Sequence, residues 1–326
     1  DLQLDYYFDS YSHFGIHEEM LKDEVRTLSY RNAIMRNHEL FKDKVVLDVG
    51  CGTGILCMFA AQAGARLVIG VDMSGMLERA RDIVKANAYA DKIILLRGKM
   101  EEVKLPVPKV DIIISEWMGY GLLYESMLDT VLWARDAYLA PGGFLLPDRA
   151  TMWLAAIEDA DYKHKKIDFW EDVYGFDMSV MKEYVRREPL VDVVEADAVC
   201  TNSCKLIDFD LTTVRKEDLA FSVDYRLPVK RSDTVHALLL WFSVDFSFRQ
   251  HPKSKLVSFG TGPAEKYTHW KQTVFYLPKD VQVEDGGVVK GLFKCRPNDV
   301  NPRELDFDIS YSYNDGESLS YQYHLQ

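Results

Sequence analysis

The sequence predicts an α/β domain with a doubly wound parallel sheet, followed by a second domain that is rich in β-strands. Up to residue 148, short apolar segments alternate with amphipathic segments of helical spacing. This alternation is typical of strands that are buried between two layers of helices. After residue 150, strand-like segments follow one another, several with period-two alternation. The length of 326 residues also favours two domains, because one hydrophobic core seldom serves a chain of this size.

The first domain, which we place at 1–148, begins with an amphipathic helix predicted over 18–40. Its apolar residues recur at helical spacing, and acidic residues come early, where the helix dipole favours them. The apolar residues are Met20, Leu21, Val25, Leu28 and Ile34. Buried strands are then predicted at 45–50, 67–72, 92–98 and 110–116, and helices at 54–63, 75–88 and 122–138.

The second domain, 149–326, is expected to form a β-barrel, because closure of a sheet removes exposed strand edges. Strands are predicted at 151–158, 205–211, 219–227, 235–246, 271–277, 288–295, 305–313 and 318–325.

One segment of the second domain, about 160–190, has helical spacing and interrupts the series of strands. It is rich in large apolar side chains, namely Phe169, Trp170, Tyr174, Phe176 and Met178. So many aromatic residues in an insertion favour an arm that docks on another subunit. The alternative is an ordinary connecting helix that packs on its own barrel.

The formal net charge of −12 argues against nucleic acid as a direct partner, since phosphate binding requires a basic surface. An acidic surface suits basic substrates, or it serves solubility alone. No segment approaches the ~20 apolar residues of a membrane span, and the longest apolar run, 237–244, suits a buried strand. We therefore expect no membrane partner.

The five cysteines form no CxxC pair, and their odd number predicts no disulfide framework. A reducing compartment is expected, so we predict a location in the nucleus and cytoplasm. Cys200 and Cys204 lack a matching Cys/His pair, and no metal is predicted. Because the chain starts at Asp1 rather than at a methionine, we expect further residues upstream.

A glycine-rich turn, VLDVGCGTG at 46–54, follows the first strand of the predicted parallel sheet, where such sheets bind nucleotides. Gly50, Gly52 and Gly54 have GxGxG spacing, which differs from the GxGxxG of dinucleotide-binding folds. Asp48 adds a carboxylate beside the turn. This combination suits a cofactor that carries an amine or a sulfonium rather than a pyrophosphate.

Two further acidic positions follow the next strands. Asp72 ends the second strand, where a carboxylate can accept hydrogen bonds from ribose hydroxyls. Met100 and Glu101 follow the third strand and could border an adenine, although a solvated acidic loop is the simpler interpretation of that segment alone.

With these motifs in place, the chain resembles the type I protein arginine methyltransferases. The resemblance rests on the glycine-rich turn, the acid that ends the next strand and SEWMGYGLLYESM at 115–127. It extends in order to YFDSY at 7–11, the segment 13–27, the arm and YTHW at 267–270. It implies a Rossmann-type domain that binds S-adenosylmethionine (AdoMet), a β-barrel domain and an arm that mediates a head-to-tail homodimer.

The resemblance also implies how AdoMet is held. His17 and Arg26 would contact its methionine part, with the Arg26 guanidinium pairing with the carboxylate. Asp72 would hold the ribose, although the family usually has the longer Glu there, and Met100 and Glu101 would border the adenine. A lid over the cofactor would come from Tyr7, Phe8 and Tyr11.

Glu116 and Glu125 flank the loop WMGYGLLY, which leaves the carboxyl end of a predicted parallel strand. Two carboxylates that face one pocket repel each other unless a cation lies between them. A guanidinium offers planar paired donors to both. The alternative, two ordinary surface glutamates, is far less compatible with the surrounding motif.

The resemblance further implies that His269 relays a proton and that Asp23 orients it, whereas a lone histidine is more often structural. Trp270 and Trp117 either pack against the guanidinium stem or fill the core. Met20 and Met127 would surround the acceptor nitrogens.

The predicted function is methyl transfer from AdoMet to protein arginines, giving monomethylarginine and then asymmetric dimethylarginine, with S-adenosylhomocysteine (AdoHcy) as the second product. Expected substrates are basic Arg/Gly-rich proteins, including histones and RNA-binding proteins. Two alternatives remain: an AdoMet enzyme that acts on a small molecule, and an inactive scaffold that binds cofactor and partners.

Overall fold

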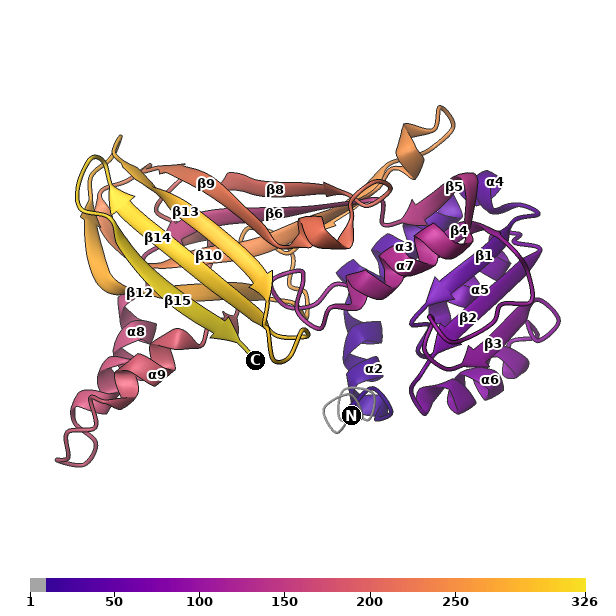
Figure 1. The fold of residues 1–326 in the computed structure, drawn as a ribbon, viewed down its shortest axis with the longest axis horizontal. Helices are drawn as coiled ribbons and strands as arrows, with labels where there is room; N and C mark the ends of the chain where they lie inside the picture. The colour runs from indigo at the N-terminus through magenta and orange to yellow at the C-terminus, as the bar shows by residue number, and fades with distance from the viewer. Residues whose placement is uncertain (1–9) are drawn as a thin grey trace.

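The computed structural model describes residues 10–326 (Figure 1). Tyr7 and Phe8, predicted for the lid, lie outside this range. The parallel α/β domain and the antiparallel β domain lie side by side, and the arm projects from the β domain. None of the described helices is both long and apolar enough to cross a membrane.

The first domain has a five-stranded sheet in the order β3-β2-β1-β4-β5, with all neighbouring pairs parallel. Its strands are β1 (Val45–Val49), β2 (Leu67–Asp72), β3 (Ile93–Arg97), β4 (Val110–Ile114) and β5 (Leu139–Leu146). Helices α5 (Ile55–Gln62), α6 (Met76–Ala86) and α7 (Met127–Tyr138) connect them. The doubly wound prediction is confirmed. The strand order reverses between β1 and β4, and such a reversal opens a crevice for a ligand.

The prediction of one helix over 18–40 was wrong. The chain forms α2 (Phe14–Lys22), α3 (Glu24–Arg36) and the short α4 (His38–Phe41). Asp23 separates α2 from α3 because its backbone is extended and its Oδ1 accepts a hydrogen bond from the Arg26 amide at 3.0 Å. This N-cap satisfies an amide that otherwise lacks a partner at a helix start. It also aims the Asp23 carboxylate toward the second domain.

The helix predicted over 122–138 begins only at Met127. Glu125 and Ser126 have φ angles of 76° and 58°, which an α-helix cannot include. The segment that carries Glu125 is therefore a loop.

The second domain consists of two antiparallel sheets. One contains β6 (Arg149–Ile157), β7 (Leu190–Asp192), β8 (Cys204–Asp210), β10 (Asp233–Phe246), β11 (Val257–Gly260) and β12 (Gln272–Val283). The other contains β9 (Phe221–Pro228), β13 (Val288–Pro297), β14 (Leu305–Tyr313) and β15 (Leu319–Leu325). The edge strand β8 lies against β9, and β12 lies against β15, which gives the domain the cross-section of a barrel.

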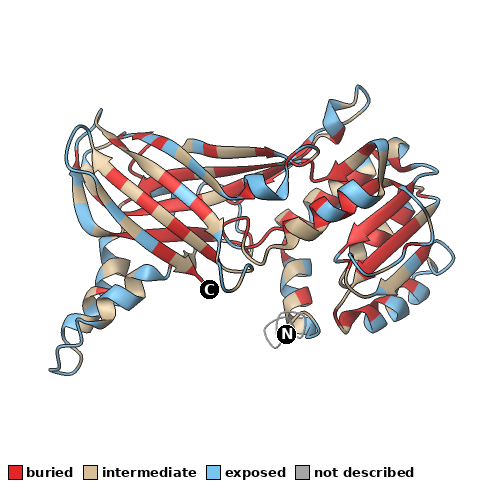
Figure 2. Ribbon diagram, viewed as in Figure 1, coloured by how far each residue is buried: buried red, intermediate tan, exposed pale blue. Residues whose placement is uncertain are grey.

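Parallel pairing ends at Leu146 and antiparallel pairing begins at Arg149. Aromatic side chains connect the two domains there. Tyr30 of α3 packs edge-to-face on Phe246 at a centroid distance of 4.8 Å, and Phe248 packs against Phe41. Buried residues therefore continue from one domain into the other (Figure 2). The shared core fixes the relative position of two domains that both contribute to the site.

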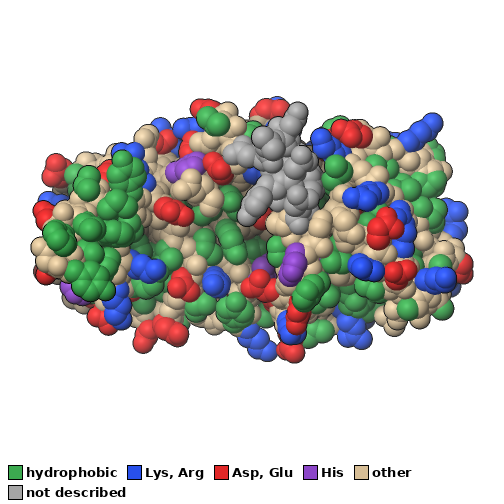
Figure 3. Space-filling model, turned by 90° about the horizontal axis from the view of Figure 1, so that it is seen from below, with side chains coloured by type: hydrophobic (Ala, Val, Ile, Leu, Met, Phe, Trp, Pro, Cys, Tyr) green, Lys and Arg blue, Asp and Glu red, His purple; other side chains and the backbone are tan. Residues whose placement is uncertain are grey.

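The arm contains α8 (Ala160–Lys166) and α9 (Met181–Arg187), joined through a 3-10 turn at Asp168–Glu171. Its tip exposes large apolar side chains: Tyr174 is 97% and Phe176 70% exposed, and Tyr184 of α9 is 69% exposed. Figure 3 shows hydrophobic side chains gathered at the same end of the molecule. Such a patch on a projecting element is typical of a protein interface.

Candidate active site

A cavity of about 350 Å³ opens at the carboxyl ends of the parallel strands, between the glycine-rich turn, α2 and the loop before α7. Most of the predicted site residues line it: Tyr11, His17, Met20, Arg26, Gly50, Gly52, Asp72, Met100, Glu101, Glu116, Glu125, Met127 and His269. Residues far apart in the sequence thus meet at the switch point of the sheet.

The glycine-rich turn brings backbone close to the cavity. Gly50 and Gly52 have φ angles of 75° and 50°, a region that favours glycine. A Cβ at Gly52 would lie 3.0 Å from His17 Cε1, and a Cβ at Gly50 would overlap the Met127 side chain. Gly54, with φ of 80°, faces α6 instead and does not line the cavity. Its contact with the cofactor therefore remains a prediction, whereas its close approach to α6 is structural.

Asp48 also differs from the prediction, because it does not line the cavity. The side chain is completely buried, and Cys57 Sγ donates to its Oδ2 at 3.1 Å. Burial raises the pKa of the Asp48 carboxyl to about 7. It lies near the end of β1, the central strand of the sheet, behind the glycine-rich turn.

Asp72 fixes the turn from the end of β2. Its Oδ2 accepts a hydrogen bond from the Gly52 amide at 2.8 Å, and its Oδ1 accepts one from the Ser74 amide at 2.7 Å. Each carboxylate oxygen has a second lone pair available to a ribose hydroxyl. Asp72, which is one methylene shorter than the Glu usual in the family, thus bonds the turn and still lines the cavity.

Met100 and Glu101 form another wall of the cavity, after β3. Met100 is 3% exposed and lines the cavity with an apolar side chain, whereas Glu101 Oε1 accepts a hydrogen bond from the Thr130 hydroxyl at 3.0 Å. An apolar wall beside a carboxylate suits an aromatic ring that carries an amino donor.

Glu116 is paired within the protein. Arg26 Nε donates to Glu116 Oε2 at 2.9 Å, and only 8% of each side chain is exposed. Arg26 Nη1 also donates to the Met20 carbonyl oxygen. A guanidinium has five N–H donors, so this arrangement leaves donors of Arg26 for a carboxylate in the cavity.

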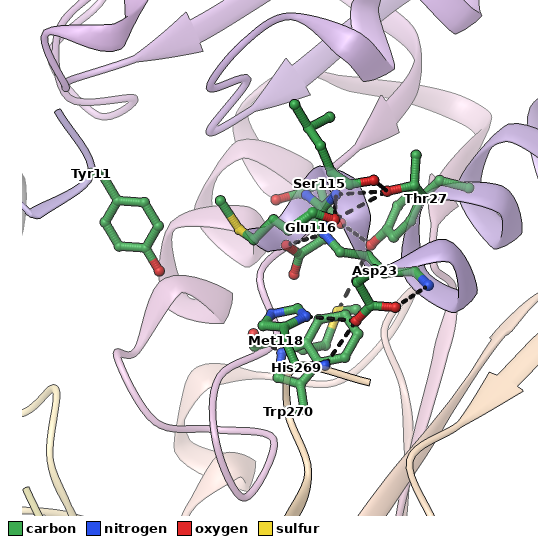
Figure 4. Close-up of polar contacts among 12 residues, drawn as sticks. Tyr11, Asp23, Thr27, Ser115, Glu116, Met118, His269 and Trp270 are labelled. Atoms are coloured by element: carbon green, nitrogen blue, oxygen red, sulfur yellow. Dashed lines mark hydrogen bonds and ion pairs between the residues drawn. The ribbon is translucent and has the colours of Figure 1, made fainter. Parts of the chain in front are cut away.

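Glu125 comes from the same loop as Glu116. The Tyr11 hydroxyl donates to Glu125 Oε2 at 2.8 Å, and the Tyr11 carbonyl oxygen lies 2.7 Å from His17 Nε2. Figure 4 shows Tyr11 on the opposite side of the site from Glu116, Asp23 and His269. The segment before α2 thereby reaches one of the two glutamates.

Asp23 and His269 join the two domains at the edge of the cavity. His269 Nδ1 lies 2.7 Å from Asp23 Oδ2, which also accepts from the His269 amide at 2.9 Å (Figure 4). Burial favours a higher pKa for Asp23, but the hydrogen bonds from His269 and the Arg26 amide outweigh it and lower the pKa. The carboxylate therefore stays ionised and fixes the ring.

Trp270 was predicted either to pack against the substrate guanidinium or to fill the core, and the structure places it in the core. It is 3% exposed, stacks on Phe259 at 5.6 Å and donates from Nε1 to the Met118 carbonyl oxygen at 2.8 Å. An indole satisfies its N–H in this way when it is buried. Trp270 thus anchors the loop that carries His269, whereas Trp117 does line the cavity.

The arrangement fits AdoMet. The turn forms a cradle that a Cβ at Gly50 or Gly52 would fill. Acidic side chains stand at the two positions expected beside ribose and adenine, and the Arg26 guanidinium lines the cavity and could bind the methionine carboxylate. Among residues 10–326, no cluster of three or more His, Cys, Asp or Glu side chains could hold a metal ion.

The sequence interpretation missed Arg303 and Thr130, which also line the cavity. Arg303 lies between β13 and β14, in a loop with no motif and far from the first domain in sequence. Thr130 lies one helical turn after Met127, so it could have been found from the helix that follows the loop.

Comparison of the sequence with known proteins identifies the same family. Residues 46–143 match the model of a methyltransferase domain, and residues 148–316 match that of the arginine methyltransferase oligomerization subdomain. The chain is 63% identical to protein arginine N-methyltransferase 1 of Schizosaccharomyces pombe, over 96% of this chain and 91% of that protein. It is 56% identical to the protein of the same name from Saccharomyces cerevisiae, over 97% and 91%.

Two solved structures have the same fold over nearly the whole chain. An enzyme–prozyme heterotetramer of Trypanosoma brucei protein arginine methyltransferase 1 with AdoHcy aligns with a TM-score of 0.93 and 46% identity, covering 98% of this chain and all of that one. Protein arginine methyltransferase 10 of Arabidopsis thaliana aligns with a TM-score of 0.89 and 31% identity, covering 97% and 99%. The chain belongs to the type I protein arginine methyltransferases, which take their methyl group from AdoMet.

Proposed function

We propose that Glu116 and Glu125 hold the arginine guanidinium of a protein substrate while one of its terminal nitrogens receives the methyl group. The observation that supports this most is that both carboxylates line one cavity together with the glycine-rich turn. AdoMet, when bound, supplies a methyl group that its sulfonium makes electrophilic. Every other part of the reaction depends on how this chain binds, orients and deprotonates its substrate.

Arginine is a weak nucleophile because its positive charge is delocalised over three nitrogens. A carboxylate on one edge of the guanidinium draws positive charge toward itself and leaves the opposite nitrogen richer in electrons. Fixing that nitrogen in line with the methyl group removes much of the entropic cost of a bimolecular step, up to ~7–11 kcal/mol in favourable cases. Positioning and electrostatics are therefore the main contributions of Glu116 and Glu125.

The substrate guanidinium is already a cation, so the nitrogen that receives the methyl group has to release one proton for the product to remain a monocation. His269 suits this step, because its Nδ1 is bonded to the Asp23 carboxylate and Nε2 is left as the ring nitrogen that can accept a proton. Met20 and Met127 would enclose the acceptor nitrogen with flexible apolar side chains.

The proposed substrates are basic Arg/Gly-rich proteins, including histones and RNA-binding proteins. The net charge of −12 would attract such polycations, and glycines would let a substrate chain approach the cavity closely. The test is incubation with AdoMet and an Arg/Gly-rich peptide, with a peptide in which every Arg is replaced by Lys as the control. Methylation of the Arg peptide alone supports the proposal, whereas methylation of both peptides or of neither contradicts it.

We further propose that the arm mediates a homodimer, because its tip exposes Tyr174 and Phe176 and the oligomerization subdomain model covers it. Replacing residues 168–180 by a short Gly/Ser linker should give a monomer with reduced activity. Analytical ultracentrifugation measures the change, and a dimer that survives at micromolar concentration would refute the role of the arm.

A location in the nucleus and cytoplasm is proposed from cysteine usage: all five cysteines are unpaired in the structure. Microscopy of the fluorescently tagged full-length protein tests this, and a signal confined to the secretory pathway would contradict it.

A further inference from the structure

The backbone that carries Glu125 is held in a conformation that its sequence does not favour. Glu125 and the following Ser126 have φ angles of 76° and 58°, in a region that residues with a Cβ seldom adopt. Two such residues in succession persist only where their surroundings impose them. The surroundings should therefore contain a structure that fixes this backbone.

That structure is the β13–β14 loop of the second domain, residues 298–304. This loop lies at the end of the second domain that faces the first domain (Figure 1). The Glu125 amide donates to the Arg303 carbonyl oxygen at 2.7 Å, and Arg303 Nη1 donates back to the Glu125 carbonyl oxygen at 2.7 Å. Glu125 thus has both of its backbone polar groups bonded to one residue of the other domain.

Ser126 adds a third connection to the same loop. Its hydroxyl donates to the Pro302 carbonyl oxygen. Ser126 stands at the N-cap of α7, where a serine side chain usually accepts from a helix amide, but it makes no such cap here. The Ser126 hydroxyl therefore bonds the β13–β14 loop instead of an amide of α7, so the loop rather than the helix fixes this side chain.

The β13–β14 loop is itself ordered by internal hydrogen bonds. Asn298 Oδ1 accepts from the amides of Val300 and Asn301 at 2.9 and 3.0 Å, and the Glu304 amide donates to the Asn301 carbonyl oxygen at 2.9 Å. The Arg303 amide donates to Asn301 Oδ1 at 3.2 Å. These hydrogen bonds fix the β13–β14 loop and with it the position of Arg303 beside Glu125.

We propose that Arg303 is a positioning residue of the reaction: it holds Glu125 in the left-handed conformation that directs its carboxylate into the cavity opposite Glu116. This proposal rests on the role of Glu125 proposed above. Because the guanidinium of Arg303 acts on the backbone of Glu125, its removal changes the direction of the carboxylate and leaves the AdoMet-binding turn intact.

The test compares Arg303→Ala with Arg303→Lys and with Arg296→Ala. Arg296 lies in the same hairpin, where it pairs with Asp306 at 2.9 Å and with Asp299 of the β13–β14 loop at 3.4 Å, so its removal controls for loss of a cation and its ion pairs from this region. We expect Arg303→Ala to lower kcat roughly tenfold or more, since a small misplacement of a reacting group costs that much. Its KM for AdoMet and its affinity for AdoHcy, measured by calorimetry, should stay within about twofold of wild type. Arg303→Lys should recover most of kcat, because its ammonium can still donate to the Glu125 carbonyl oxygen.

The proposal is overturned if kcat of Arg303→Ala stays within about twofold of wild type, if Arg296→Ala loses as much, or if AdoHcy affinity falls in parallel with kcat. If Arg303→Ala does not fold, Arg303→Lys becomes the deciding variant, and a kcat of the folded Arg303→Lys protein roughly tenfold or more below wild type would contradict the role of the donor. An inactive wild-type chain would refute the proposed function instead, so the two failures are distinguishable.

Discussion

Arg26 and Glu116 form a buried ion pair with an Nε–Oε2 distance of 2.9 Å, whereas Glu125 accepts a hydrogen bond from the neutral Tyr11 hydroxyl. The partners that the two glutamates have among residues 10–326 therefore differ. The charge of Glu116 is partly balanced by a cation of the enzyme, and the same cation faces the cavity where the methionine end of AdoMet would lie. One arginine thus connects the cofactor end of the site to the acceptor end.

Arg26→Lys should weaken AdoHcy binding and lower turnover together. A lysine ammonium is a point charge and cannot donate to Glu116, the Met20 carbonyl oxygen and a ligand carboxylate in one plane. We expect an affinity loss of roughly tenfold, measured by calorimetry. Arg31→Lys, on the exposed face of α3, is the matched control. Unchanged AdoHcy affinity in Arg26→Lys would show that Arg26 serves Glu116 alone.

Glu125→Gln should reduce turnover by about two or more orders of magnitude at saturating peptide, because it replaces a charged partner of the guanidinium by a neutral one. AdoHcy affinity should stay close to that of wild type. Glu116→Gln should reduce turnover similarly and should also destabilise the fold, since Arg26 then keeps a buried charge without its counterion. Glu102→Gln, an exposed acid near the site, controls for the loss of one negative charge. Near-normal turnover of either site variant would exclude that glutamate from the reaction.

Gly52→Val should abolish AdoHcy binding. A Cβ at this position would lie 3.0 Å from His17 Cε1, and the φ of 50° disfavours a β-branched residue. Gly142→Val is the matched control, because Gly142 has a φ of 74° but nothing within 4 Å of a Cβ. The control carries the backbone strain without filling the cradle, so calorimetry should detect binding in it. Equal loss in both variants would attribute the effect to strain alone.

Asp48→Asn should change how stability depends on pH. The folded protein holds the Asp48 proton up to a pKa of about 7, whereas the unfolded chain releases it near the ordinary value of ~3.9. Between these two pKa values the folded state binds more protons than the unfolded state, so this group lowers stability as pH rises. The variant lacks that loss. Its melting temperature should exceed that of wild type at pH 8, and the difference should shrink toward pH 4; a difference independent of pH would contradict the buried neutral carboxyl.

Much of the fold could be predicted because burial leaves a clear pattern. The strands β1 to β4 are almost continuous apolar runs, and the GxGxG turn marks the switch point between β1 and β4. β5 was not predicted, because Pro141, Gly142 and Gly143 interrupt it. The break at Asp23 was missed because the apolar spacing continues across it, and a single capping carboxylate outweighs that spacing.

Site residues that belong to sequence motifs could be predicted. Residues whose position depends on contacts between distant parts of the chain could not. The family resemblance predicted that Asp23 orients His269, and in the structure His269 Nδ1 lies 2.7 Å from Asp23 Oδ2. Trp270 follows His269 directly, yet its indole turns into the core to bond Met118. Arg303 had no local signal, since its contact with Glu125 spans 178 residues and two domains.

The most direct test of the two-glutamate site is the identity of its final product. Glu116, Glu125, Met20 and Met127 line one cavity, and on the proposed function they enclose one acceptor position, so the second methyl should go to the nitrogen that already carries the first. Fragmentation of a dimethylated Arg/Gly-rich peptide in the mass spectrometer distinguishes the isomers, since asymmetric dimethylarginine loses dimethylamine and symmetric dimethylarginine loses monomethylamine. We predict monomethylarginine early in the reaction and predominant loss of dimethylamine from the final product. Predominant loss of monomethylamine would contradict a single acceptor position between the two glutamates.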